Sequence, residues 1–298
     1  MDLYVSVKRT NFSLFKKRLF KRIYKKLGLI GIEGIIILIF FVVMAIAAKK
    51  IVPYGINEQV GPSFLAPSFE HLLGTDDCGY DLFSLLIWGS RISLTIGFAV
   101  GILSVSGGLI WGVLAGGIGG IVDMILMRMS DVFQSIPQTP FLIVVSAYTG
   151  SSLKNIILIL SIFMIPRLGR IIRGQVLSIK ENTYIKAAGM FGANIFYIVK
   201  RHFIPELLPL ICVFLIQMVG RAIIIEAGLA FLGLGDPTNK SWGMVIHYAL
   251  ESPSTYLTSS WLWRVFPFTL CVVLINIGLA LLGYAVENNI DPRFKKST

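Results

Sequence analysis

Continuous apolar runs of membrane-span length constrain this chain more than any other feature of its sequence. Its 298 residues are 55% hydrophobic and only 14% charged, and the mean hydropathy is +0.77. A soluble domain of this length could not bury so much apolar surface, so part of it must face lipid. The runs are continuous, unlike the alternating segments of roughly ten residues that build membrane barrels. The sequence therefore predicts an all-α integral membrane protein.

Six segments are expected to cross the membrane, because each approaches the roughly 20 residues that a helix needs to span the hydrocarbon. The third segment contains Pro137 and Pro140. We expect a kinked helix there, with the freed carbonyl groups paired to neighbours or water. The segments lie at about 29–51, 92–117, 121–148, 153–172, 207–234 and 265–286.

Positive charge is unevenly distributed between the two sides of these spans. The segments expected on the cytoplasmic side hold 20 Lys and Arg residues, whereas those expected outside hold 4. Lys and Arg concentrate on the cytoplasmic side of membrane proteins. We therefore predict a multi-pass protein of the cell (inner or cytoplasmic) membrane with both termini in the cytoplasm. Because the basic residues flank spans, we expect membrane lipid and no nucleic acid as the partner of this charge.

No enzyme signature occurs in the sequence. The patterns G-x-x-x-x-G-K-[ST], H-E-x-x-H and G-x-S-x-G are absent, and neither the three histidines nor the three cysteines cluster. An intramembrane protease would need paired acids or a Ser–His arrangement at membrane depth, where only Glu33 and Glu226 are clearly placed. The chain is therefore predicted to have no catalytic residue, cofactor or metal site. Any energy that it uses must come from a partner.

The segment 178–209 is polar, basic and broken by glycine, and it lies between two apolar runs. We expect a short helix over Thr183–Phe191, a left-handed residue at Gly192 that ends it, and a second helix from the cap Asn194 to Pro205. Composition alone leaves two interpretations open, an amphipathic connector at the membrane surface and a docking surface for a partner.

Glycines recur at an interval of four residues in the second predicted span, which places them on one face of a helix. Such a groove lets another helix approach closely, either as static packing or as a contact that moves. The glycines are Gly108, Gly112, Gly116 and Gly120.

Polar residues interrupt the fifth predicted span. Charges within a membrane are costly and usually face a cavity or a partner. Arg221 and Glu226 are five residues apart, so they do not form a simple intrahelical pair. They and Gln217 are candidate pore-lining residues, and structural pairing is the alternative for the two charged ones.

Four motifs in order give the chain a resemblance to a known family. The segment Tyr184–Gly192 with the following His202-Phe-Ile-Pro205 resembles the cytoplasmic "EAA" loop of ABC-importer permeases, and the whole pattern is similar to the C-type subunit of the oligopeptide, dipeptide and nickel permease group. The supporting segments are His71–Asp81, Glu226–Gly235 with Ser241-Trp-Gly243, and Asp291-Pro-Arg293.

The resemblance implies a six-helix fold like that of type I ABC importer permeases, in which the chain forms half of a pore and couples the motion of an ATPase to alternating access. It implies a homologous second permease, two cytoplasmic ATP-binding subunits and an external substrate-binding protein as partners. The coupling residues that it implies are Tyr184, Lys186, Ala187, Ala188, Gly189, Gly192, His202 and Pro205.

Charge, hydropathy and the resemblance together divide the chain into four expected parts. They are a basic cytoplasmic arm (1–29), a first span with an external loop-rich segment (30–88), a permease core (89–287) with its coupling loop (178–209), and a cytoplasmic tail (288–298).

The sequence departs from the family pattern at two positions. Lys186 stands where the family usually has an acid, and Tyr80 stands where it usually has a basic residue. The predicted cargo is a peptide or related solute, with nickel or a metal chelate as the alternative within the family. A self-sufficient transporter or channel would be expected to show inverted repeats or clustered ion ligands, and neither is evident. A non-transporting scaffold or receptor is the other alternative.

Overall fold

The structure, a computed structural model, describes residues 28–56 and 58–290. Most of the predicted basic arm and most of the predicted tail, including Asp291-Pro-Arg293, lie outside the described residues.

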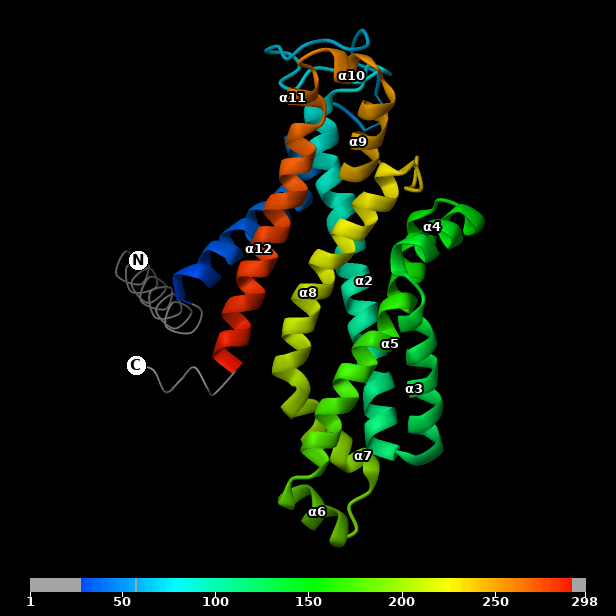
Figure 1. Ribbon diagram of the computed structural model, residues 1–298. Helices are drawn as coiled ribbons and strands as arrows, with labels where there is room; N and C mark the ends of the chain where they lie inside the picture. The colour runs from blue at the N-terminus through cyan, green and yellow to red at the C-terminus, as the bar shows by residue number, and fades with distance from the viewer. Residues whose placement is uncertain (1–27, 57, 291–298) are drawn as a thin grey trace, which may run out of the picture.

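Five helical stretches in this part of the chain are long and apolar enough to cross a membrane. They confirm the predicted all-α, multi-pass membrane architecture, and Figure 1 shows them as an elongated bundle. The stretches are Gly28–Ile51, α2 (Leu82–Ile118), α5 (Leu153–Lys180), Ile195–Phe231 and Trp261–Asn289. The fourth comprises α7 (Ile195–Ile198), the π-helical turn η1 (Val199–Phe203) and α8 (Ile204–Phe231), and the last contains α11 (Trp261–Arg264) and most of α12 (Phe266–Ile290).

The third predicted crossing consists of two separate helices and not of one kinked helix. Helix α3 (Gly120–Ser135) ends before Ile136, which is extended, and α4 (Gln138–Thr149) begins after Pro137. The residue before a proline is disfavoured in the helical conformation, so the chain breaks there. Pro140 lies in the first turn of α4, where its missing N–H costs no hydrogen bond. Both helices run along α5 (Figure 1), and neither is among the five stretches that are long and apolar enough to cross a membrane.

Helices α2 and α5 approach each other at backbone distance along the predicted glycine stripe. A Cβ atom added to Gly112 would lie 2.7 Å from the carbonyl oxygen of Gly169 and 2.7 Å from Cβ of Ile172. Gly108 and Gly116 lie equally close to the same face of α5. Small residues at such a contact permit van der Waals packing that larger residues would prevent.

Gly120 does not belong to this contact, so the predicted stripe was wrong at its last member. Helix α2 ends at Ile118, and Gly120 begins α3 with a φ of 57° and no atom within 4 Å of an added Cβ. Carbonyl groups at the end of α2, which lack partners within the helix, accept hydrogen bonds from α5. Nζ of Lys180 donates to the carbonyl oxygens of Gly116 and Gly117 at 3.4 and 3.0 Å.

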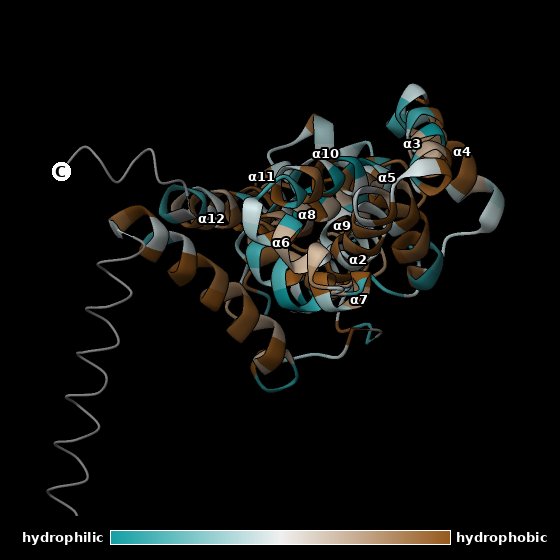
Figure 2. Cartoon of the chain, turned by 90° about the horizontal axis from the view of Figure 1, so that it is seen from below, coloured by the Kyte–Doolittle hydropathy of each residue, from teal (hydrophilic) through white to brown (hydrophobic). Residues whose placement is uncertain are grey.

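The first helix, Gly28–Ile51, packs on α12 at the edge of the bundle. Its Phe41 is buried and meets Trp242, the first residue of α9 (Trp242–Glu251), edge to face with ring centroids 5.5 Å apart. In Figure 2, viewed from the end that carries α6 (Thr183–Met190), this helix is largely hydrophobic in colour. Its outer face suits contact with lipid or with another membrane helix.

The opposite end of the bundle, near α9, is covered by residues 52–56 and 58–81 together with α10 (Ser254–Leu257) and α11. Asp81 caps α2 by accepting a hydrogen bond from the backbone N–H of Ser84 at 2.8 Å, and His71 Nδ1 lies 3.1 Å from the same carboxylate. Burial of these polar groups with their partners makes this cover part of the folded structure.

Tyr80, one of the two departures from the family pattern, contacts a cation in this cover. Nζ of Lys240 lies 3.5 Å from the centroid of the Tyr80 ring and 3.8 Å from the Asp76 carboxylate. Burial raises the pKa of Asp76 and lowers that of Lys240, each opposed in part by the charge of the other. A positive charge therefore lies beside position 80, but Lys240 carries it and residue 80 does not.

We predict that Gly112→Ala destabilises the protein by about 1–3 kcal/mol, because the new methyl group would overlap backbone and side-chain atoms of α5. The thermal unfolding midpoint of the detergent-solubilised protein measures this loss. Gly174→Ala is the matched control, since Gly174 lies within α5 with open space around it. Equal midpoints for the two variants would contradict the close contact between α2 and α5.

Candidate functional site

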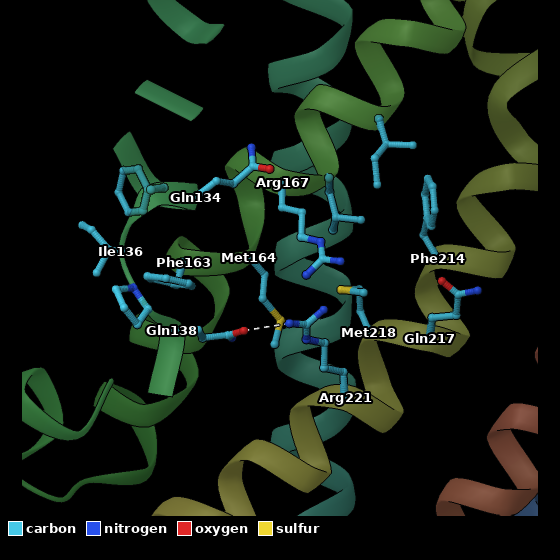
Figure 3. A pocket seen from close by; sticks show the side chains of 14 residues that line it. Gln134, Ile136, Gln138, Phe163, Met164, Arg167, Phe214, Gln217, Met218 and Arg221 are labelled. Carbon is cyan, nitrogen blue, oxygen red and sulfur yellow. Dashed lines mark hydrogen bonds between the residues drawn. The ribbon is translucent and has the colours of Figure 1, made fainter. Parts of the chain in front are cut away.

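A cavity of about 530 Å³ lies between α5, α8 and the break between α3 and α4 (Figure 3). We call it the α5–α8 pocket. Each of these elements contributes polar and apolar side chains, and Arg167 enters near the midpoint of α5. The lining includes Phe133 from α3 and Gln138 from α4, which flank the break, Met164 and Arg167 from α5, and Gln217 and Arg221 from α8.

The break between α3 and α4 positions one wall of this pocket. Gln138 is the first residue of α4, and its Oε1 accepts a hydrogen bond of 2.7 Å from Nη2 of Arg221 (Figure 3). Irregular backbone at membrane depth is tolerated where it is buried in protein or lines a water-filled cavity. The interruption and the pocket are therefore physically consistent with each other.

The three arginines of α5 differ in their partners, and the sequence alone did not distinguish them. Arg170 pairs with Asp131 of α3, and Arg173 binds Asp123 of α3 with two hydrogen bonds, one of them Nη2 to Oδ2 at 2.6 Å. Arg167 has no ion pair among the described residues, and its side chain points into the pocket. From the sequence, all three lie near the end of the predicted span 153–172 and would simply mark that end as cytoplasmic. The available signal was that α3 carries two acids for these three arginines.

The candidate pore-lining residues divide between two environments. Gln217 and Arg221 line the α5–α8 pocket, whereas Glu226 is 2% exposed and away from it. Its Oε2 has no hydrogen-bond partner in the part of the chain that the structure describes. Five residues turn a helix by about 140° beyond one full revolution, so Arg221 and Glu226 cannot share a face.

The segment 178–209 has the predicted helix–turn–helix geometry. Helix α6 covers Thr183–Met190, and Gly192 follows with a φ of 84°. Asn194 caps α7 by accepting a hydrogen bond of 2.7 Å from the backbone N–H of Tyr197. The predicted cap at Asn194 and the left-handed glycine at position 192 are confirmed.

The second helix does not end at Pro205 as predicted, because it continues through η1 into α8. A proline within a helix lacks a donor and clashes with the carbonyl group four residues earlier. The wider π-helical turn at Val199–Phe203 precedes Pro205 and relieves this conflict. Residues Ile195–Phe231 therefore form one continuous helical stretch.

Three contacts hold α6 against the bundle. Ile185 is buried in a cluster with the ends of α5 and α8. The hydroxyl of Tyr184 donates a hydrogen bond to Glu206 of α8, which raises the pKa of Tyr184, and its ring lies 5.6 Å from that of His202. Nζ of Lys186 lies 2.6 Å from Oε2 of Glu181 and lowers the pKa of that carboxyl.

The outer face of this segment is exposed and apolar. Met190 and Phe191 are 89% and 92% exposed, and Phe196 is 72% exposed. Gly189 and Gly192 are exposed with open space around them, whereas Ala187 and Ala188 are half-buried. Exposed apolar residues grouped on a rigid support are typical of a surface that binds another protein.

Residues 108–296 match the protein family described as binding-protein-dependent transport system inner membrane component. The chain is 32% identical over 293 residues to the dipeptide transport system permease protein DppC of Bacillus subtilis, covering 98% of this chain and 89% of that protein. It is 33% identical over 269 residues to the glutathione transport system permease protein GsiD of Pectobacterium atrosepticum, covering 89% and 88%. It is 30% identical over 292 residues to the oligopeptide transport system permease protein OppC of B. subtilis, covering 97% and 93%.

We predict that a cysteine at position 217 is accessible to a hydrophilic thiol reagent, because Gln217 is exposed at the α5–α8 pocket. In a background without native cysteines, Gln217→Cys should react at least about tenfold faster than Val219→Cys, since reaction requires an exposed thiolate. Val219 lies on the same helix and is 1% exposed. Equal labelling rates in proteoliposomes would show that the pocket is not open to water.

Proposed function

This chain belongs to the family of binding-protein-dependent transport system inner membrane components, and we propose that it is the permease subunit of an ATP-driven importer for peptides or related solutes. The observation that carries this proposal is the near full-length similarity to permease subunits whose names specify dipeptide, oligopeptide and glutathione transport. It forms half of the pore and transmits motion from an ATPase.

The α5–α8 pocket supports a role in translocation. It combines Arg221 and Gln217 with the helix interruption between α3 and α4. Transporters commonly build solute sites from interrupted helices, because the broken backbone presents polar groups to a cavity. We assign the pore-lining role to Arg221 and Gln217, and a structural role to the buried Glu226.

The segment 178–209 supports coupling to an ATPase. Its exposed apolar residues project from a helix that is held on the ends of α5 and α8, so a force on α6 reaches two membrane spans. Within the segment 178–209, the positive charge of Lys186 is compensated by its ion pair with Glu181. Docking here accordingly relies on apolar contact at Met190 and Phe191 more than on a charge at position 186.

The proposed assembly contains a homologous second permease, two cytoplasmic ATP-binding subunits and an external substrate-binding protein. In this assembly the α6 end faces the cytoplasm and the α9 end faces outward. The distribution of 20 against 4 basic residues between the two expected sides supports this orientation in the inner membrane, with both termini cytoplasmic. ATP hydrolysis belongs to the separate subunits, since the similar proteins are named permeases.

The function is tested by reconstituting the chain with these partners in proteoliposomes and measuring ATP-driven uptake of a mixture of small peptides. Uptake that requires ATP, the binding protein and this subunit is the expected result. Uptake without ATP would favour a channel or self-sufficient transporter, and no uptake of any solute would favour a scaffold or receptor.

We predict that Gly189→Leu uncouples the importer while leaving this chain folded. Gly189 lies in α6 with open space around it, so the new side chain fits the isolated chain but obstructs a protein that docks there. Peptide-stimulated ATP hydrolysis should fall at least about tenfold, which corresponds to about 1.4 kcal/mol.

Gly174→Leu is the control, because Gly174 also has open space but lies in α5. Assembly of each variant with its partners is checked by size-exclusion chromatography. If an assembled Gly189→Leu complex shows normal peptide-stimulated ATP hydrolysis, α6 is not the coupling element.

A further inference from the structure

The α5–α8 pocket is lined by two guanidinium groups and, within the part of the chain that the structure describes, by no carboxylate. Arg167 enters from α5 and Arg221 from α8, and Figure 3 shows both groups directed into the same space. The remaining polar side chains at the pocket are the neutral amides of Gln134, Gln138 and Gln217.

The two neighbouring arginines of α5 have structural roles, because each forms an ion pair with an acid of α3. About one turn further along the helix Arg170 pairs with Asp131, and about two turns further Arg173 pairs with Asp123. Arg167 has no such acid among residues 28–56 and 58–290. Helix α3 therefore neutralises two arginines of α5 and leaves the third charge facing the pocket.

Arg221 likewise has no ion pair with any acid of the described ranges. Its Nη2 binds the amide oxygen of Gln138, which orients the guanidinium toward the α5 side. Glu287 lines a different pocket, on the α12 side of Arg221. Glu287 therefore does not line the α5–α8 pocket, which the two guanidinium groups share.

Two guanidinium groups on predicted membrane helices, with no carboxylate partner among the described residues, need an anion or water. Charged residues within membrane helices are costly to insert and mark ligand pathways. Guanidinium groups suit carboxylates in particular, because their planar donors match the two carboxylate oxygens. The pocket volume of about 530 Å³ falls within the range of about 300–1,000 Å³ found for sites of small ligands.

The rest of the lining fits the remainder of a small peptide. The amides of Gln138 and Gln217 can donate to and accept from peptide groups, and Phe163 and Met164 offer apolar contact to side chains. Two positive charges would repel a bare divalent cation.

We propose that Arg167 and Arg221 form a subsite that holds the free carboxylate of a peptide during its passage through the pore. The proposal rests on the importer function and specifies its cargo as a carboxylate-bearing solute. Arg167 is the new member of the site, and Gln138 is a positioning residue for Arg221.

The test uses the complete importer in proteoliposomes with a mixture of di- and tripeptides, each supplied as the free acid and as the C-terminal amide. Internalised peptides are measured by mass spectrometry. In the double variant Arg167→Gln/Arg221→Gln, we expect uptake of the acids to fall at least about tenfold, as for loss of a charge-assisted contact. The ratio of acid to amide uptake should fall as well, and any preference of the binding protein cancels when this ratio is compared with that of the wild type.

Two controls separate the anion subsite from damage to the fold. Arg167→Lys/Arg221→Lys keeps both charges and should retain most acid uptake, while Arg170→Gln removes a charge from the same helix outside the pocket and should leave the acid-to-amide ratio unchanged. The proposal would be overturned if Arg167→Gln/Arg221→Gln took up the free acids as well as the wild type does. It would also be overturned if this variant and Arg167→Lys/Arg221→Lys lost equal amounts of acid uptake. Absence of ATP-driven uptake in the wild type would instead refute the importer function.

Discussion

Direct contact between the backbones of α2 and α5 is the constraint on which the remaining arrangement depends. At Gly112 and Gly169 the two helices meet without intervening side chains, and van der Waals packing at such close range is one of the forces that drive helix association in lipid. Helix α2 ends just beyond this contact at Ile118, so α3 must fold back along α5. That return brings two acids of α3 to two arginines of α5. The third arginine is thereby left for the pocket.

The same contact supports the segment that is proposed to receive an ATPase. Lys180, at the end of α5, binds the final carbonyl groups of α2, and α6 follows after a short connection. Ile185 then inserts into the cluster that joins α5, α2 and α8. Displacement of α6 consequently acts on helices that line the pocket. Whether a helix pair moves as a unit depends on such packing, because close-packed interfaces shift between discrete arrangements and do not deform continuously.

Local rules predicted much of the segment 178–209 and of the spans. Asn194 was expected as a helix cap and Gly192 as a left-handed residue, since only short-range chemistry decides those conformations. The two prolines were harder to interpret. Pro137 was expected to kink a helix and divides it in two, whereas Pro205 was expected to end a helix and is absorbed by a π-helical turn. The outcome at a proline depends on whether neighbouring helices can satisfy the freed backbone groups, and a single sequence does not contain that information.

The amino-acid sequence by itself determined the membrane environment, the helical class, the family and the position of the exposed segment. These follow from apolar runs, charge distribution and short motifs, which are local properties of the chain. Tertiary structure alone decided which arginines are paired and which are not. Arg167, Arg170 and Arg173 recur every three residues in similar sequence surroundings, but the partners of the last two come from α3, some forty to fifty residues earlier in the chain. The strength of a charge interaction depends on distance and on the surrounding medium, and only packing of α3, α5 and α8 sets both.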